Sequence, residues 1–226
     1  MFNLLSPAKL NLSLEVNSLL DNGFHNLTSI MHTLHLHDEI SISYSKNTKT
    51  VFIPSTVEGS NNSILDAVRL FQQEFHIQDQ VEIVITKNIP TSSGLGGGSS
   101  NSAAVLKELI KINKLEVELS KQRELAFQLS SDSPFFVSGG CSLVEGQGEK
   151  ITTGLGINNL WSIIFTPLNL AISNKTRFMY SLLSKQHYSD GSITTEIFNS
   201  INQPNTDFLQ LLSNTVNTFE QVIDQA

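Results

Sequence analysis

The glycine-rich run between residues 90 and 104 is the part of the chain whose residue types best suit the binding of an anion. It reads Pro-Thr-Ser-Ser-Gly-Leu-Gly-Gly-Gly-Ser-Ser-Asn-Ser-Ala-Ala, so that Gly94, Gly96, Gly97 and Gly98 lie close together. Glycine accepts positive φ angles and lets the backbone approach a ligand closely. The run follows a stretch typical of a strand and precedes one typical of a helix, and the first amides of a helix attract phosphate oxygens. This spacing therefore predicts a phosphate-binding loop.

Two common phosphate motifs do not match the run. No Gly-Lys-Ser or Gly-Lys-Thr follows the glycines, as a Walker A loop requires. Ser99 stands where a dinucleotide-binding fingerprint has its third glycine. Ser99 and Ser100 add hydroxyl donors at the predicted start of the helix. The alternative interpretation is a flexible loop whose serine caps that helix.

Side-chain periodicity predicts the elements that must hold this loop. Residues 8–16 alternate, with Leu10, Leu12, Leu14 and Val16 on one face, and indicate a half-buried strand. Further strands are expected over residues 27–45 (two strands or one bent strand), 80–86 and 160–173, and residues 135–137, 139–140 and 141–145 together suggest a further strand after a turn. Helices are expected over residues 63–76, 100–113, 120–130 with Ser120 as N-cap, 175–184 and 205–225. Strands and helices mix without a regular βαβ alternation, which favours an α+β fold.

Length and composition limit the class of protein. The 226 residues are 39% hydrophobic with a mean hydropathy of -0.03, enough for one large domain or one domain with a smaller partner. A change of pattern near residues 154–159 predicts a boundary between domains at 1–155 and 156–226. The formal net charge of -7 argues against nucleic-acid binding. Cys141 is the single cysteine and is expected to be a buried structural thiol. With no apolar run of membrane-spanning or signal-peptide length, we expect a cytoplasmic protein.

The histidines at residues 32–37, which read His-Thr-Leu-His-Leu-His, have two interpretations: a metal site, or histidines at the surface of a strand. His35 and His37 would share a strand face, a geometry that a metal can use. Beyond Asp38 and Glu39, no cysteine or carboxylate nearby completes a ligand set. Histidines at the surface of a strand are therefore the favoured interpretation, and no metal site is expected.

The glycine run also resembles a known family. Pro-x-x-x-Gly-Leu-Gly-Gly-Gly-Ser-Ser-Asn is similar to the second motif of the GHMP kinases, which include galactokinase, homoserine kinase, mevalonate kinase and phosphomevalonate kinase. The doubled glycine before Ser-Ser-Asn narrows the resemblance to the 4-diphosphocytidyl-2-C-methyl-D-erythritol kinases of non-mevalonate isoprenoid synthesis. Residues 6–12 (Ser-Pro-Ala-Lys-Leu-Asn-Leu), 21–25 (Asp-Asn-Gly-Phe-His) and 132–135 (Asp-Ser-Pro-Phe, with one substitution) match that family in the same order along the chain.

The resemblance implies a fold and a reaction. The fold would be that of the GHMP kinases, with an N-terminal ribosomal-protein-S5-like α/β domain (1–155) and an incomplete C-terminal α+β domain (156–226). The reaction would be ATP-dependent phosphorylation of the 2-hydroxyl of 4-diphosphocytidyl-2-C-methyl-D-erythritol, with Mg²⁺ arriving with ATP. The expected ATP-binding residues are Pro90, Gly94, Leu95, Gly96, Gly97, Gly98, Ser99, Ser100, Asn62 and Lys87.

Two residues acquire catalytic roles only through the resemblance. Taken alone, Asp132 before a serine and a proline is typical of a turn or cap, and Lys9 of a solvated strand residue. The resemblance places Asp132 at the position of the catalytic base and Lys9 at that of its lysine partner. A carboxylate can take the hydroxyl proton, and a nearby ammonium can hold that carboxylate ionised.

Four further residues are implied to bind the acceptor substrate. Asn11 would hold it near the transferred phosphoryl group. Phe24 stands where the family usually has tyrosine and would stack on cytosine through its aromatic face. His25 would read the cytosine edge, and Phe178 would form the other side of the stack.

The chain also departs from the family near its C-terminus and within the glycine run. The family's third glycine-rich motif, of the Gly-Thr-Gly type, is not found, and the family continues beyond the last residue here, so the chain is expected to be truncated or a fragment. Thr91-Ser92-Ser93 replaces the small, glycine-rich residues often seen there. The alternatives are another GHMP small-molecule kinase and a truncated non-catalytic nucleotide-binding protein. The Phe24-His25 pair argues against the first alternative, and Lys9 with Asp132 against the second. The sequence gives no oligomeric state.

Overall fold

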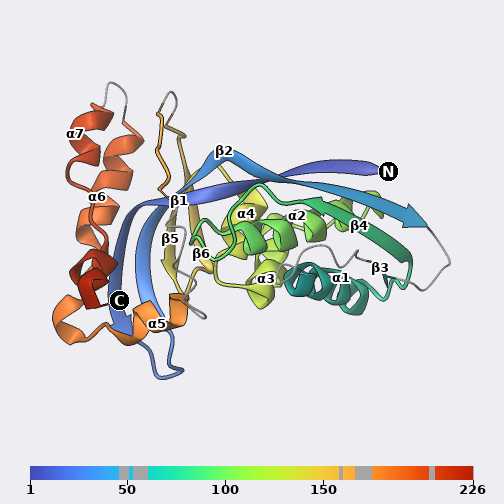
Figure 1. The fold of residues 1–226 in the computed structure, drawn as a ribbon, viewed down its shortest axis with the longest axis horizontal. Coiled ribbons are helices and arrows are strands. Elements are labelled where there is room, and N and C mark those ends of the chain that lie inside the picture. The colour runs from blue at the N-terminus through green and yellow to red at the C-terminus, as the bar shows by residue number, and fades with distance from the viewer. Residues whose placement is uncertain (46–50, 53–60, 158–159, 166–174, 204–206, 226) are drawn as a thin grey trace. The chain divides into compact units, whose positions relative to one another are not determined.

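The chain packs as two compact units. The computed structural model describes residues 1–226 except 46–50, 53–60, 158–159, 166–174, 204–206 and 226 (Figure 1). The first unit comprises Met1–Lys9 and Leu34–Ser138, and the second comprises Leu10–Thr33 and Gly139–Ala226. Each unit uses two stretches of chain because the long strands β1 (Phe2–Leu19) and β2 (His25–Ser45) contribute residues to both. The boundary predicted from composition at residues 155/156 stays a prediction.

The strands of the first unit form a sheet against which its helices pack. β4 (Gln80–Thr86) is antiparallel to β2, from the pair Glu39↔Thr86 to Ser45↔Gln80, and β3 (Val51–Phe52) is parallel to β4. Alternate residues of these strands are apolar, and Ile40, Ile42 and Ile83 are buried in the core that the helices complete. The predicted strand at 80–86 is confirmed, and the one predicted over 27–45 is a single continuous strand.

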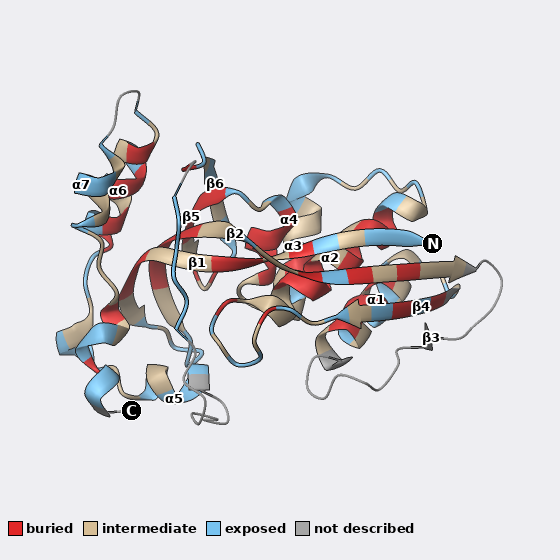
Figure 2. Cartoon of the chain, turned by 45° about the horizontal axis from the view of Figure 1, so that its top comes forward, coloured by how far each residue is buried: buried red, intermediate tan, exposed pale blue. Residues whose placement is uncertain are grey.

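The described residues of the first unit include four helices: α1 (Asn61–Phe75), α2 (Gly97–Ile112), α3 (Leu119–Leu129) and α4 (Ser133–Ser138). α2 packs against the other three, and its buried residues are prominent in Figure 2. Val105, Leu106 and Leu109 follow the helical period and are fully buried, so they fix which face of α2 points into the core. The helix that bears the glycine run is therefore held firmly along its length.

The second unit is a smaller α+β assembly. β5 (Cys141–Gly146) is antiparallel both to β2, over Leu27–His32, and to β6 (Lys150–Gly154). Its helices are α5 (Lys175–Ser181), α6 (Ser192–Ile201) and α7 (Phe208–Leu212), with 3-10 turns at Lys185–His187, Thr218–Gln221 and Ile223–Gln225. The core joins strand residues such as Ile30 and Leu143 to Ile197, Phe198 and Ile201 of α6. The helix predicted over 175–184 is confirmed as α5, whereas β6 and α6 were not predicted.

The half-buried character predicted for β1 is wrong for its central residues. Lys9, Ser13 and Glu15 lie on the face expected to be solvated, yet each is at least nine-tenths buried. In the second unit, α6 covers this face: Glu15 Oε2 accepts a hydrogen bond from Thr194 N at 2.7 Å, and the hydroxyls of Ser13 and Thr194 are 2.8 Å apart. The alternating pattern correctly identifies the polar residues of β1. Their burial depends on contacts with residues far away in the sequence, which the pattern does not show.

Two predictions near α3 and α4 also need correction. Ser120 is not an N-cap, because the helical ladder already starts at the Glu118 carbonyl, which accepts from Gln122 N at 3.0 Å. Phe135, Phe136 and Val137, which were grouped with the strand predicted after a turn, lie in α4, whereas the strand itself is confirmed as β5 and begins at Cys141. Pro134 suits the first turn of a helix, where its missing N–H leaves no hydrogen bond unmade.

The strand predicted nearest the C-terminus is wrong in its described part, and the helix predicted over 205–225 is confirmed only as α7 (Phe208–Leu212). Residues 160–165 form no strand, and residues 166–173 lie outside the described residues. The helix predicted over 205–225 is broken after α7, because the following backbone pairs with β1 instead: Leu14 N donates to Val216 O at 2.7 Å, and Leu14 bridges Asn217. Helical spacing of apolar residues did not reveal this competing partner.

Candidate active site

The glycine run forms the turn that starts α2. Gly94 and Gly96 have φ angles of 82° and 72°, and Gly96 is the N-cap. The helix begins at Gly97, earlier than the predicted residue 100, so the glycines themselves make the first turn. The first intrahelical bond runs from Ser100 N to Gly96 O at 2.9 Å. Because Gly96 has no side chain to cap the helix, the first-turn amides are left to a ligand, which suits the phosphates of ATP.

The backbone of β1 fixes the position of this loop. Lys9 N donates to Leu95 O at 2.9 Å, and the Leu95 side chain packs with Ala8 and Ile89. Gly96 lies so close to its neighbours that an added Cβ would be 2.9 Å from Phe136 Cζ and 3.0 Å from Lys9 Cγ. The loop thus requires glycine at residue 96 for both its φ angle and its surroundings.

Lys9 and Asp132 form an ion pair in the first unit. Lys9 Nζ lies 3.3 Å from Asp132 Oδ2, and the side chains are 6% and 31% exposed respectively. A buried ammonium requires a counter-charge, and the Asp132 carboxylate supplies it. Because the Asp132 side chain is partly exposed while that of Lys9 is covered, the carboxylate is the member of the pair that an incoming hydroxyl can reach.

A cluster of four serines holds the turn that carries Asp132. Ser130 Oγ donates to Ser99 Oγ at 2.8 Å and lies 2.6 Å from Ser133 Oγ. Ser133 Oγ also donates to Ser99 O at 3.2 Å and lies 3.2 Å from Ser102 Oγ. The Asp132 turn is thereby fastened to the first turn of α2. Sequence reasoning missed these contacts, although serines on both sides of Asp132 were a visible signal.

Lys87 and Asn62 are the ATP-binding candidates outside the glycine run. Lys87 Nζ is bonded to Asp38 Oδ2 and would lie 3.2 Å from a Cβ added to Gly97. Its ammonium is therefore beside the glycine turn and already paired. Asn62 lies in the first turn of α1, but its side chain falls outside the described part of the structure.

The candidate acceptor-binding residues Asn11, Phe24, His25 and Phe178 all belong to the second unit. Phe24 follows the Asn-Gly turn, where its N–H donates to Asn22 Oδ1 at 3.1 Å, and its side chain is 57% exposed. Phe178 lies in α5 and is 37% exposed. Asn11 is half-buried on β1. Both aromatic rings thus keep surface available for stacking.

Two tyrosines that sequence reasoning missed surround His25. The rings of His25 and Tyr180 stack at 4.9 Å between centroids, and Tyr188 Oη lies 3.2 Å from His25 Nε2. Burial lowers the pKa of His25, so the imidazole is kept neutral near pH 7. A neutral imidazole with one ring nitrogen protonated can donate one hydrogen bond and accept another.

Comparison with known proteins decides the family. A family model described as the GHMP kinases N terminal domain matches residues 62–140. The 4-diphosphocytidyl-2-C-methyl-D-erythritol kinase of Dehalococcoides mccartyi is 35% identical over 222 residues, which are 98% of this chain and 77% of that protein. The chain belongs to the 4-diphosphocytidyl-2-C-methyl-D-erythritol kinase family of the GHMP kinases.

Further matches support this kinase family and its fold. The kinase of Listeria welshimeri is 34% identical over 223 residues, with 96% of this chain and 74% of that protein covered. A crystal structure of a 4-(cytidine 5'-diphospho)-2C-methyl-D-erythritol kinase has a TM-score of 0.71 at 23% identity and covers 99% of this chain and 78% of that one. The predicted α+β GHMP kinase fold is confirmed, and the chain spans about three quarters of the length of these relatives.

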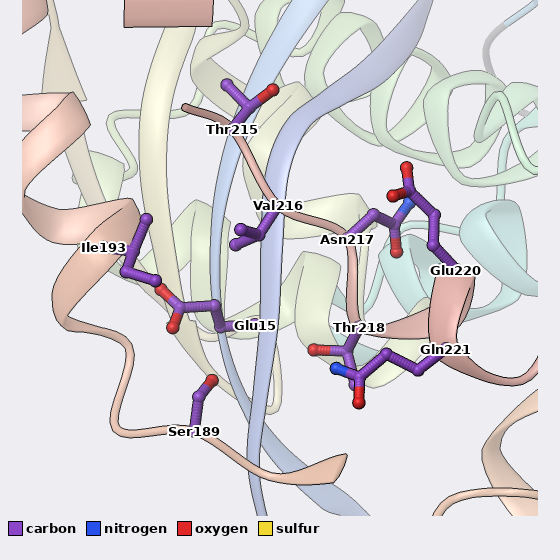
Figure 3. Close-up of a pocket in the computed structure, with 9 residues that line it drawn as sticks. All are labelled: Glu15, Ser189, Ile193, Thr215, Val216, Asn217, Thr218, Glu220 and Gln221. Carbon is purple, nitrogen blue, oxygen red and sulfur yellow. The ribbon is translucent and has the colours of Figure 1, made fainter. Parts of the chain in front are cut away.

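A cavity of about 390 Å³ lies in the second unit of this GHMP kinase (Figure 3). None of the sequence-predicted site residues lines it. Figure 3 shows the Glu15 side chain reaching from β1 toward Ile193, next to the residue whose N–H it accepts, Thr194. A carboxylate at a helix start stabilises the helix, so the described contacts of Glu15 assign it to the packing of α6.

The described residues offer little for metal, membrane or thiol chemistry. Among them, no group of three or more His, Cys, Asp or Glu is placed to hold a metal ion, and no helix is long and apolar enough to cross a membrane. Cys141 is buried, as predicted, and burial raises the pKa of its thiol to about 11. The thiol is therefore protonated and unreactive at neutral pH.

Proposed function

We propose that this chain transfers the γ-phosphoryl group of ATP to the 2-hydroxyl of 4-diphosphocytidyl-2-C-methyl-D-erythritol. The chain is a kinase of the corresponding family, and its relatives carry that substrate in their names. The observation that best supports the reaction is the Lys9–Asp132 ion pair, because the N–H of Lys9 also holds the glycine loop through Leu95 O. One residue thus links the phosphate loop to the carboxylate.

Asp132 is proposed as the general base. Its carboxylate accepts the proton of the 2-hydroxyl while that oxygen forms a bond to the γ-phosphorus, and the bond between this phosphorus and the leaving oxygen of ADP breaks. Lys9 holds the Asp132 carboxylate in position before the transfer and offsets negative charge on the moving phosphoryl group. The amides of Gly97, Gly98 and Ser99 hold phosphate oxygens during this step.

Mg²⁺ arrives with ATP in this proposal and neutralises part of the phosphate charge. ATP use follows from membership of the GHMP kinases, and the remaining loop residues Pro90, Gly94, Leu95, Gly96 and Ser100 shape the site. Lys87 is proposed to contribute beside the loop, and Asn62 beside the nucleoside.

The cytidine group is proposed to bind in the second unit. Phe24 and Phe178 stack on the cytosine ring, and His25 reads its polar edge. The stacking of His25 on Tyr180 and its contact with Tyr188 support this role, because they fix the orientation of the imidazole. Asn11 is proposed to hold the acceptor near the transferred phosphoryl group.

The substrate assignment is tested by ADP release with three acceptors in parallel. With Mg-ATP present, we expect turnover with 4-diphosphocytidyl-2-C-methyl-D-erythritol and none above background with homoserine or mevalonate. Turnover with either of the other alcohols would reassign the acceptor to another GHMP kinase reaction. Absence of turnover with all three, alongside intact ATP binding, would favour a non-catalytic nucleotide-binding protein.

A further inference from the structure

Asp38 is a fully buried carboxylate that none of the proposed chemistry uses. It lies in the part of β2 that belongs to the first unit and is 0% exposed. Oδ1 accepts hydrogen bonds from Asn88 N at 2.8 Å and Ile89 N at 2.9 Å. Oδ2 accepts from Asn101 Nδ2 at 2.9 Å and from the Lys87 ammonium. Four donors thus converge on one side chain.

The partners of Asp38 flank the phosphate loop on both sides. Lys87, Asn88 and Ile89 directly precede the loop, and Asn101 lies in α2 just after its first turn. A single carboxylate therefore joins the start of the loop to its end. Such a cross-link limits the conformations that the glycine run can adopt, which matters because glycine has more backbone freedom than any other residue.

The residues that Asp38 holds also pack against the first residue of α2. A Cβ added to Gly97 would lie 3.1 Å from Ile89 Cγ2 and 3.2 Å from Lys87 Nζ. The Lys87 ammonium is therefore kept at the turn whose amides are expected to meet phosphate. Asp38 also orients the Asn101 side-chain amide, because Asn101 Nδ2 donates to Asp38 Oδ2. Asn101 Oδ1 is buried and has no hydrogen-bond partner among the described residues, so it does not help to fix this orientation.

A purely structural role does not explain why the buried side chain at residue 38 is charged. Burying a carboxylate and an ammonium together costs desolvation energy that an apolar pair of similar size avoids. The charge instead provides something an apolar side chain cannot: an acceptor for two backbone amides, a side-chain amide and an ammonium at once. All four of those donors border the loop.

We propose that Asp38 is a positioning residue that shapes the phosphate loop for the triphosphate of ATP. It touches no substrate and acts through Lys87, Asn101 and the amides of Asn88 and Ile89. The proposal rests on the proposed function of the loop as the ATP phosphate site. It is independent of the identity of the acceptor alcohol.

The test is the Asp38→Asn variant, which keeps the shape of the side chain but loses its charge. Direct ATP binding should weaken roughly tenfold, as expected for the loss of charged hydrogen bonds. KM for ATP should rise in parallel while KM for the acceptor stays unchanged. Simple loss of folded enzyme would lower kcat and leave both KM values alone. Unchanged ATP affinity, or an equal rise in both KM values, would overturn the proposal.

Two further variants keep the test decisive if Asp38→Asn does not fold. Asn101→Ala leaves the Asp38–Lys87 pair intact and removes only the link to α2, so ATP affinity should fall about threefold. Glu108→Gln is the control, since it makes the same carboxylate-to-amide change on α2 at a residue paired with Lys111 instead of the loop. It should bind ATP like the unaltered chain, and an Asn101→Ala variant that does so too would overturn the proposal.

The binding measurement also separates this proposal from the proposed function. If the unaltered chain binds ATP but phosphorylates none of the acceptors, while Asp38→Asn still loses ATP affinity selectively, the positioning role holds and the acceptor assignment fails. If the unaltered chain does not bind ATP at all, both proposals fail.

Discussion

Replacing Gly96 with alanine should destabilise the first unit far more than the same change two residues earlier. Gly96 has a φ angle of 72°, and a left-handed backbone costs an alanine about 1–2 kcal/mol. Its new Cβ would also meet Phe136 Cζ at 2.9 Å and Lys9 Cγ at 3.0 Å. Phe136 and Lys9 are both buried, so packed atoms must shift to remove the clash. Such a shift costs about 1–3 kcal/mol more.

Gly94→Ala is the matched control for this change. Gly94 has a similar φ angle of 82°, but no described atom lies within 4 Å of where its Cβ would be. The two variants therefore share the backbone strain and differ by the steric clash alone. For a chain of this size, a difference of about 1–3 kcal/mol corresponds to unfolding midpoints roughly 2–12 °C apart.

Calorimetric unfolding of both variants measures that difference, and turnover per folded molecule provides a second readout. Because the clash pushes on Lys9 Cγ, Gly96→Ala should also disturb the Lys9–Asp132 pair and lose more turnover than Gly94→Ala. Equal unfolding midpoints for the two variants would refute the reasoning that Gly96 is confined by Phe136 and Lys9.

Three further predictions follow from aromatic exposure and from pKa shifts. Phe24→Ala should raise KM for the cytidine substrate up to about tenfold and leave KM for ATP nearly unchanged, since only one stacking face is lost; an equal effect on both would remove Phe24 from the cytosine site. Because burial lowers the pKa of His25 in the folded chain, the unfolded chain binds that proton first as the pH falls below 6.5, so the free energy of unfolding should decline. Urea titrations should show a shallower decline for His25→Gln, and identical slopes would contradict this. Cys141, whose thiol pKa is raised to about 11 by burial, should react with iodoacetamide at pH 8 only after unfolding in urea, and rapid alkylation of the native chain would count against it.

The parts of the fold that were predictable from the sequence are those governed by local periodicity. α1 and β4 were predicted almost to the residue, and the helix after the glycine run was predicted with a start three residues too late. α2 starts early because Gly96 adopts a left-handed conformation and lets Gly97 enter the helix, which no apolar spacing reports. Local patterns therefore predict which helices and strands form more accurately than they predict the residues at which these elements begin and end.

The parts that were not predictable depend on contacts between distant residues. The apolar residues over 205–225 have helical spacing. The Val216 carbonyl, however, accepts a hydrogen bond from Leu14 N of β1, so this part of the backbone does not continue the helix. The burial of Glu15 has the same cause, since α6 packs over a strand face that alternation marks as polar. Neither contact leaves a signal in the local sequence.

The candidate site shows the same division. The glycine loop was recognisable from its residues, because glycine content and position between strand and helix have a direct physical meaning. Lys9 and Asp132 were not recognisable from their own surroundings, and only the family resemblance paired them. The serine cluster was missed although serines flank Asp132 in the sequence. The contact between Tyr188 and His25 was missed because the two residues are 163 residues apart in the sequence.

The most direct test of the account is the turnover of Asp132→Asn with 4-diphosphocytidyl-2-C-methyl-D-erythritol. Loss of a general base should lower kcat by about 10²–10⁴-fold. ATP affinity should stay within about twofold, since Asp132 is not proposed to bind the nucleotide. Asp66→Asn, at an exposed carboxylate of α1 paired with Arg69, is the control and should turn over normally. If Asp132→Asn keeps more than about a tenth of the original kcat, Asp132 is not the base.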